Sequence, residues 1–264
     1  MLIVCNGIFK SGSTWLHAIV LEIIKMNNLQ LTDVPYFYTN NTSSPTTIIE
    51  SKLKYFLLTE DYFSKHYITK SHYYLSSTLK AKYDENIFFL FVERDVRDAV
   101  VSHFYHLKKK YKIFNNFNFY YYTLGRFKAY EILVLNNEYK KAFGTSNFFQ
   151  YSQMKNDFTS IVHKLSSILK LKTLNLQEIE TIKKNTSINK MRNDLRIGTS
   201  NYYSTVKKNR DKLIRKGEIG DWKNYFSKKQ QYDIMTIELD DVTFLFRFFY
   251  YIFFTLRRRL FKIE

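Results

Sequence analysis

A short segment rich in glycine and serine has the residue types that hold phosphate. Residues 7–15 read G-I-F-K-S-G-S-T-W, after an apolar run that begins at Leu2 and before a helical pattern. A helix that begins directly after such a turn offers backbone N–H groups and the positive end of its dipole to an anion. Gly12 allows the backbone to approach that anion closely. The segment favours an anion site, with a plain strand-to-helix turn as the alternative.

The same segment differs from the loop of ordinary nucleoside triphosphatases. Its spacing, Gly7-x4-Gly12, resembles a P-loop, but serine follows the second glycine where lysine is required. The lysine stands earlier, at Lys10. A second strongly apolar run ends Val92-Glu93-Arg94, so it supplies no clear acid for Mg²⁺. The sequence therefore disfavours an ordinary nucleoside triphosphatase.

Histidine is the side chain best suited to accept a proton near neutral pH, and the chain has six. His72 is the strongest candidate because it follows a short candidate strand at residues 67–71. Open α/β sheets present their ligands at such strand ends. An ordinary loop histidine is the alternative. His103 and His106 lie on a predicted helix and are interpreted as packing or surface residues.

Alternating strands and helices must position these segments. Apolar strands are predicted at residues 2–9 and 86–92, and shorter candidate strands at residues 67–71 and 147–151. Helices are predicted over residues 13–26, 95–110, 124–142 and 154–171. Asp95 is the expected N-cap of the second helix, and residues 27–51 are expected to form a long loop. The alternation is typical of an α/β fold with a central parallel sheet flanked by helices.

Composition limits the class of protein and its partners. A chain of 264 residues suits one large domain, so a single domain over residues 1–264 is predicted. The net charge of +17 predicts an anionic partner such as a nucleotide, a nucleic acid, an acidic glycan or a membrane face. Cys5 is the only cysteine and lies in an apolar run, which predicts a buried thiol in a reducing compartment. The N-terminus lacks the pattern of a secretory signal, and a cytoplasmic location is predicted.

Three motifs resemble those of the cytosolic-type sulfotransferases that use 3′-phosphoadenosine 5′-phosphosulfate (PAPS). Residues 10–15, K-S-G-S-T-W, are similar to the family's P-K-S-G-T-T-W loop. Residues 215–226, R-K-G-E-I-G-D-W-K-N-Y-F, resemble R-K-G-x-x-G-D-W-K-x-x-F at every fixed position. Residues 94–102, R-D-V-R-D-A-V-V-S, are similar to R-N-x-x-D-x-x-x-S. The resemblance covers residues 1–227 and implies a P-loop-like core related to the nucleotide kinases.

The resemblance implies a binding site for PAPS and no metal. The 5′-phosphosulfate would be held by Lys10 and by the backbone of Ser11, Gly12, Ser13 and Thr14. The adenine would be contacted by Trp15, Tyr151 and Thr186, and the 3′-phosphate by Arg94, Ser102, Arg215, Lys216 and Gly217. Arginine suits this role because its planar fork binds phosphate oxygens in pairs. Surface ion pairs of Arg94 with Asp95 and of Arg215 with Glu218 are the alternative.

Sulfuryl transfer is an in-line displacement in which the protein mainly positions groups and stabilises charge. Residues 69–72, T-K-S-H, resemble the family's K-x-H motif. This implies that His72 takes the acceptor proton, that Lys70 contacts the sulfuryl oxygens and that Lys10 neutralises the leaving phosphate oxygen. The acceptor would be a hydroxyl or amine of a small metabolite, a glycan or a lipid. The family continues H-L-P where this chain has two tyrosines, Tyr73 and Tyr74.

The C-terminal residues 241–264 lie outside the resemblance. Residues 244–254 are almost wholly apolar, and three arginines follow at 257–259. The run is too short to span a bilayer. Residues 244–262 have the composition for peripheral contact with an anionic membrane, but a terminal helix docked on the core or on a partner subunit is favoured.

Two other functions are weighed against the sulfotransferase. A P-loop nucleotide kinase or triphosphatase needs a lysine after Gly12 and an acid for Mg²⁺. A non-catalytic protein that binds anions or membranes explains the charge and the tail, but not the pattern at residues 215–226. A nucleic-acid partner is not expected.

Overall fold

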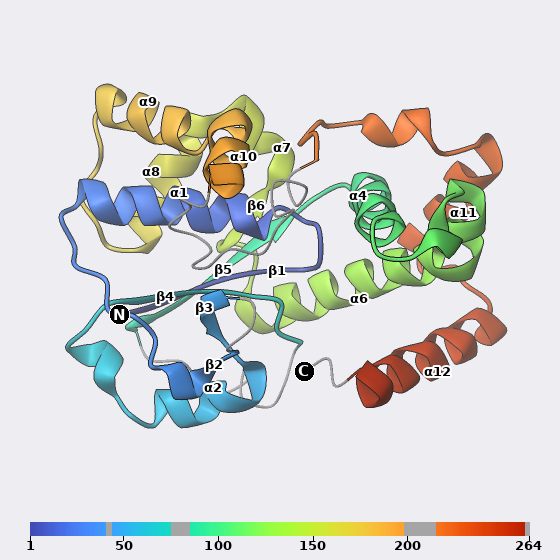
Figure 1. Ribbon diagram of the computed structural model, residues 1–264, viewed down its shortest axis with the longest axis horizontal. Helices are drawn as coiled ribbons and strands as arrows, with labels where there is room; N and C mark the ends of the chain where they lie inside the picture. The colour runs from blue at the N-terminus through green and yellow to red at the C-terminus, as the bar shows by residue number, and fades with distance from the viewer. Residues whose placement is uncertain (41–43, 75–84, 198–214, 262–264) are drawn as a thin grey trace. The chain divides into compact units, whose positions relative to one another are not determined.

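The computed structural model describes residues 1–40, 44–74, 85–197 and 215–261 (Figure 1). The chain is divided into two compact units. Unit 1 comprises Met1–Arg94 and Tyr139–Gly217, and unit 2 comprises Asp95–Glu138 and Glu218–Glu264. The single domain predicted from chain length stays a prediction.

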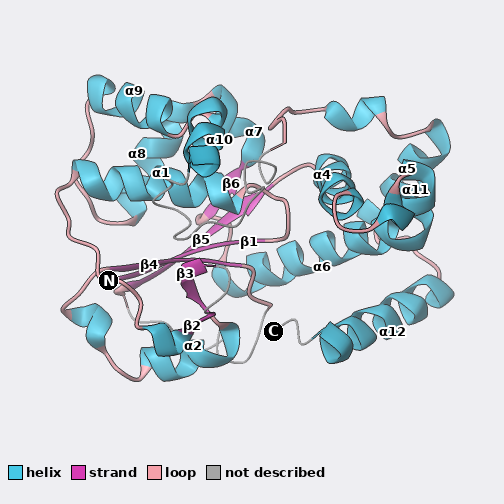
Figure 2. Cartoon of the chain, in the orientation of Figure 1, coloured by secondary structure: helices cyan, strands magenta, loops and turns pink. Residues whose placement is uncertain are grey.

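Unit 1 is built on a four-stranded sheet in which every pairing is parallel (Figure 2). The strands lie in the order β4-β1-β5-β6. Their bounds are β1 (Leu2–Gly7), β4 (Tyr67–Ser71), β5 (Ile87–Glu93) and β6 (Phe148–Gln150). All four strands were predicted from the sequence. Because they are parallel, their carboxyl ends meet at one edge of the sheet.

Apolar side chains cover both faces of this sheet, since successive residues of a strand point to opposite faces. On β5, Leu90 belongs to the buried cluster that includes Leu16 of helix α1 (Ser13–Met26). Phe91 packs on Tyr139, with ring centroids 5.0 Å apart, on the end of α6 (Arg126–Phe143). Such near-continuous apolar strands are typical of a parallel sheet covered on both faces. The predicted α/β fold is confirmed.

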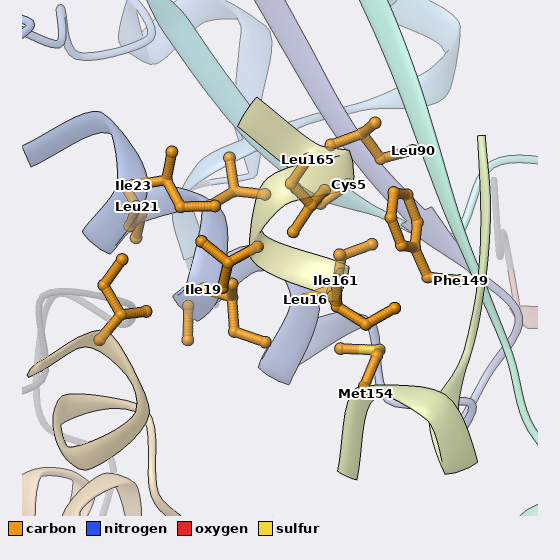
Figure 3. Close-up of a cluster of buried hydrophobic side chains, with 14 of the residues drawn as sticks. Cys5, Leu16, Ile19, Leu21, Ile23, Leu90, Phe149, Met154, Ile161 and Leu165 are labelled. Atoms are coloured by element: carbon orange, nitrogen blue, oxygen red, sulfur yellow. The ribbon is translucent and has the colours of Figure 1, made fainter. Parts of the chain in front are cut away.

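Helix α1 contributes many residues to a cluster of buried hydrophobic side chains (Figure 3). Its residues Leu16 and Ile19 pack with Ile161 and Leu165 of α8. The described residues of unit 1 also form the helices α2 (Glu50–Leu57), α7 (Tyr151–Asn156), α8 (Phe158–Ile168), α9 (Leu176–Asn185) and α10 (Ile188–Ile197). Cys5 is buried in this cluster, as predicted, and burial raises the pKa of its thiol.

Two predicted elements were wrong in outline. The expected loop at residues 27–51 contains the antiparallel pair β2 (Thr39–Asn40) and β3 (Ser44–Ile48). Ile48 is buried and its N–H donates to Thr69 Oγ1 at 3.0 Å, so tertiary contact with β4 orders this polar segment. The single helix predicted over residues 154–171 is two helices, because Asp157 ends α7 and caps α8.

Unit 2 is helical in the part that the structure describes. Its main helices are α4 (Val96–Lys108), α5 (Phe117–Tyr120), the first part of α6, α11 (Lys228–Glu238) and α12 (Phe244–Phe261). Asp95 caps α4, as predicted, by accepting from the N–H of Arg97 at 2.9 Å. Tyr120 and Tyr121 are fully buried, so these aromatic residues pack the unit. No helix of the described residues is long and apolar enough to cross a membrane.

Candidate active site

The carboxyl ends of the four parallel strands bring four sequence-predicted segments together. The loop at residues 10–15 follows β1, and His72 follows β4. Arg94 follows β5, and Tyr151 follows β6. This edge is where open α/β sheets bind their ligands. The fold of unit 1 therefore brings to one edge of the sheet four segments that the sequence predicted separately.

The loop after β1 is shaped to receive an anion. Lys10 and Gly12 both adopt positive φ, at 71° and 114°, which turns the chain sharply into α1. No side chain caps the first turn of α1, the arrangement that a bound anion satisfies. The hydroxyl of Ser11 is buried without a hydrogen-bond partner among the described residues. A buried hydroxyl of this kind fits a ligand that supplies acceptor oxygens.

The side chain of Tyr151 contacts three of the predicted donor-binding segments. Its ring lies edge-on to that of Trp15, with centroids 5.4 Å apart. The guanidinium of Arg94 lies 4.5 Å from the centre of the same ring. The hydroxyl donates to the carbonyl of Gly217 at 3.1 Å. A Cβ at Gly12 would lie only 2.7 Å from the ring. Tyr151 therefore fixes the spacing between the loop at residues 10–15, Arg94 and the motif at residues 215–226.

Gly217 closes this cluster from the far end of the chain. Its φ is +65°, and a Cβ there would lie 2.3 Å from Cδ1 of Ile188. Lys155 Nζ also donates to its carbonyl, at 2.8 Å. Of its two neighbours in the motif, Arg215 is half-buried and Lys216 is exposed. Glycine is needed at 217 because both its conformation and its surroundings exclude a side chain.

The hydrogen bonds of His72 define which ring nitrogen can act as a base. Nδ1 lies 2.5 Å from the carbonyl oxygen of Gly7. A carbonyl can only accept, so Nδ1 carries the proton. Nε2 lies 3.3 Å from the ammonium of Lys70, which can only donate. Both neighbours therefore assign the lone pair to Nε2, and the side chain of His72 is exposed.

The residues beside His72 are anchored in the core. The hydroxyl of Ser71 and the N–H of Tyr73 both donate to Oδ1 of Asn6, at 3.1 and 3.0 Å. The buried hydroxyl of Tyr73 donates to the carbonyl of Ile48 at 2.8 Å, and burial raises the pKa of Tyr73. Tyr73, which stands where the family's motif has leucine, is therefore a core residue of this chain. Asn6 was missed from the sequence, because its partner lies 65 residues away in the chain.

A family model for the sulfotransferase domain matches residues 2–237. The chain belongs to the sulfotransferase family. Among solved structures, mouse sulfotransferase SULT7A1 complexed with PAP (the desulfated donor) is similar at 22% identity, with a TM-score of 0.63. That match covers 90% of this chain and 83% of the mouse chain.

Two complexes of retinol dehydratase are also similar, each at 15% identity over 92% of this chain and 81% of that one. One holds androsterone with PAP, at a TM-score of 0.58, and the other holds retinol with PAP, at 0.57. No curated protein matches the chain. The family predicted from the three motifs is confirmed.

Other titratable groups of this sulfotransferase are less suited to the reaction. His17 is buried in α1, and burial lowers its pKa to about 3. His103 is buried and hydrogen-bonded to the hydroxyl of Tyr120 at 2.7 Å, which confirms its packing role. Glu93, the acid nearest the end of β5, contacts Lys140 at 2.8 Å and Gln150 at 2.6 Å. No group of three potential metal ligands occurs among the residues the structure describes.

The structure does not test the predicted donor contacts of Thr186 and Ser102, and their roles stay predictions. Thr186 is buried, and its hydroxyl donates to the carbonyl of Ile182 at 2.9 Å. That hydroxyl proton is already used at the end of α9. Ser102 lies half-buried on α4 in unit 2.

Asp98 is a functional-motif residue that sequence reasoning passed over. It is buried in unit 2, where its carboxylate accepts from the N–H groups of Gly220 at 2.8 Å and Trp222 at 3.0 Å. Arg97 lies over the Trp222 ring, 3.8 Å from its centroid, and pairs with Asp95 at 2.6 Å. Within unit 2, Asp98 therefore joins α4 to residues 220–222 of the other motif. The sequence did contain a signal for this contact. The motif at residues 94–102 has an acidic residue in a predicted helix, and the motif at residues 215–226 has two glycines whose N–H groups it could reach.

Replacing Asp98 by asparagine is expected to destabilise the sulfotransferase by ~2 kcal/mol, because one backbone N–H then meets an amide donor in place of a carboxylate oxygen. Urea unfolding measures this change. Asp157→Asn is the matched control, since Asp157 caps α8 through a single N–H and asparagine is an equally good cap. Equal stability of the two variants would contradict the role of Asp98.

Proposed function

We propose that this sulfotransferase transfers the sulfuryl group of PAPS to an acceptor hydroxyl or amine, with His72 as the general base. The observation that carries the proposal is the hydrogen bonding of His72. Its Nδ1–H is held by Gly7 at the end of β1, and its Nε2 lone pair lies beside Lys70. A base held in one tautomer next to the anion loop is suited to deprotonate the acceptor during an in-line displacement.

The chain's residues divide the work of binding and charge stabilisation. Lys10 and the first turn of α1 would hold the 5′-phosphosulfate and favour departure of the phosphate oxygen. Lys70 would lie against the sulfuryl oxygens. The acceptor proton goes to Nε2 of His72, and the products are the sulfated acceptor and PAP.

The adenine and the 3′-phosphate have separate supports in the proposal. Trp15 and Tyr151 offer aromatic surface for the adenine, and Arg94, held against the Tyr151 ring, offers a planar fork to the 3′-phosphate. Arg215, Lys216, Ser102 and Thr186 would complete this half of the site.

The acceptor class proposed first is the hydroxyl of a small molecule. It is supported by the similar structures, which contain androsterone and retinol. Glycan and lipid hydroxyls belong in the same acceptor panel, because a base and a sulfuryl donor act on any hydroxyl that reaches them.

Titration calorimetry with PAP in the absence of metal tests the donor site. Micromolar binding is expected for the unmodified chain. Arg94→Ala should weaken it by roughly 30-fold, or about 2 kcal/mol, because a bidentate, charge-assisted contact is lost. Lys10→Ala should weaken it as well.

Arg97→Ala is the control for the loss of an arginine. Arg97 is three residues from Arg94 but already pairs with Asp95, so PAP affinity should change by no more than about twofold. Binding of ATP with Mg²⁺ but not of PAP would replace the proposal with a nucleotide kinase. Absence of binding to both ligands would favour a non-catalytic protein.

A further inference from the structure

Helix α12 carries two apolar faces, and one of them is docked within unit 2. Phe246 stacks on Phe127 of α6, with ring centroids 5.0 Å apart. Tyr250 packs edge-on against Tyr130 at 4.8 Å. Phe253 also stacks on Phe127, at 5.9 Å. The predicted docking of this segment on the protein is thus confirmed for one face.

The opposite side of α12 exposes large apolar side chains, and we call it the exposed face. Its members are Phe244, Leu245, Phe248, Phe249, Tyr251 and Ile252. At 100° per residue, Phe244, Phe248, Tyr251 and Ile252 lie on the side of the helix away from residues 246, 250 and 253, and Leu245 and Phe249 lie at its flank. Monomeric soluble proteins seldom leave so many large apolar side chains contiguous and exposed to solvent. The exposed face is therefore expected to be an interaction surface.

The charge of the segment indicates which occupant fits. Between residues 242 and 263 the sequence contains five basic residues and no acidic one. The basic residues are Arg247, Arg257, Arg258, Arg259 and Lys262. A second copy meeting this helix about a two-fold axis would bring like charges together. An anionic lipid surface is instead complementary in charge to the segment and to the chain's net charge of +17.

The aromatic content indicates the same occupant. The exposed face consists of phenylalanine, tyrosine, leucine and isoleucine, and the basic cluster follows it in the sequence. Aromatic and basic residues of this kind are typical of helices that lie in the plane of a membrane interface. In such helices, long basic side chains reach the headgroups while the apolar face enters the acyl boundary.

We propose that the exposed face of α12 binds the surface of an anionic bilayer, with the helix lying in the interface plane and the opposite face still docked on α6. Such binding would bring the sulfotransferase to a lipid surface independently of donor binding. Membrane binding therefore goes beyond the proposed function. A negative result for membrane binding would leave the proposed sulfuryl transfer untouched.

Co-sedimentation of the full chain with vesicles tests the proposal. Vesicles of phosphatidylcholine with about one third phosphatidylserine should bind the chain, and vesicles of phosphatidylcholine alone should bind at least about tenfold less. The replacement of Arg257, Arg258 and Arg259 by glutamine should remove most of this difference. Equal binding to both vesicle types would overturn the electrostatic part of the proposal.

A pair of double variants tests the exposed face itself. Leu245→Ser with Tyr251→Ser changes side chains that are 60% and 70% exposed, and should lower binding at least about tenfold. The matched control is Leu239→Ser with Tyr232→Ser, the same residue types at 72% and 69% exposure near α11, and it should bind as the unmodified chain does. PAP titration shows that each variant is folded.

The same variants also test whether a second copy of the chain, and not a membrane, covers the exposed face. Sedimentation velocity without vesicles would reveal a dimer that the Leu245 and Tyr251 substitutions dissociate. A dimer of this kind, together with no vesicle binding, would overturn the proposal in favour of a second copy. Equal loss of vesicle binding in both double variants would also overturn it, because the effect would then not belong to the exposed face.

Discussion

The His72→Asn variant is expected to turn over an alcohol acceptor roughly 10²- to 10⁴-fold more slowly than the unmodified sulfotransferase, with PAP affinity unchanged. Asparagine keeps an N–H that can donate to the Gly7 carbonyl, as Nδ1 of His72 does. It lacks the basic lone pair of Nε2. The substitution therefore removes the proton acceptor while disturbing the loop after β1 as little as possible. Initial rates of PAP release with saturating PAPS measure the effect.

The acidity of the acceptor separates a base from a residue that only shapes the site. An acidic phenol such as 4-nitrophenol is already largely ionised near neutral pH, so its transfer needs little help from a base. The loss caused by His72→Asn should shrink as the acceptor becomes more acidic. An equal loss for phenol and alcohol would contradict the base role and point to positioning. His66→Asn, before the opposite end of β4, serves as the control and should leave both rates unchanged.

The sequence predicted the sheet and the beginning of the site because both depend on local signals. The strands at residues 2–7 and around residue 90 are short apolar runs, which is typical of parallel strands that are covered on both faces. The glycine-rich turn before α1 is likewise read from a few adjacent residues. Since each predicted segment follows a strand, placing the strands places Lys10, His72 and Arg94 at one edge.

The contacts that hold the site together could not be read in the same way, because their partners are distant in sequence. Asn6 receives two hydrogen bonds from the end of β4, more than 60 residues away. Tyr151 reaches Gly217 across 66 residues. Asp98 reaches Gly220 across 122. None of these pairs has a spacing that local geometry could reveal.

The wrong boundaries have the same cause. Residues 44–48 look polar in isolation, yet Ile48 is buried beside Thr69, and this contact makes a strand of them. Apolar periodicity continues across residues 154–171, which hides the break at Asp157. There the side chain caps α8 by accepting from the N–H of Ser160 at 3.2 Å. Capping chemistry outweighed the periodic pattern at this position.

The Gly12→Ala variant is expected to lose roughly 3–4 kcal/mol of stability and at least about tenfold in PAP affinity. Alanine at φ +114° is strained, and its Cβ would lie 2.7 Å from the ring of Tyr151. That ring cannot move away easily, because Arg94 lies 4.5 Å from its centroid and its hydroxyl is bonded to Gly217. A displacement of the Tyr151 ring by alanine at position 12 would therefore also disturb Arg94 and Gly217. Urea unfolding and PAP titration measure the two effects.

Gly144→Ala separates the steric effect from the backbone effect. Gly144 also has positive φ, at 71°, but a Cβ there would meet nothing within 4 Å. This control should lose only ~1 kcal/mol, the penalty for the left-handed conformation, and should bind PAP normally. If Gly12→Ala were no worse than Gly144→Ala, Tyr151 would not be the residue that couples the loop to the C-terminal motif. A larger loss of both stability and PAP affinity at Gly12 alone would assign that coupling to the contact between Gly12 and Tyr151.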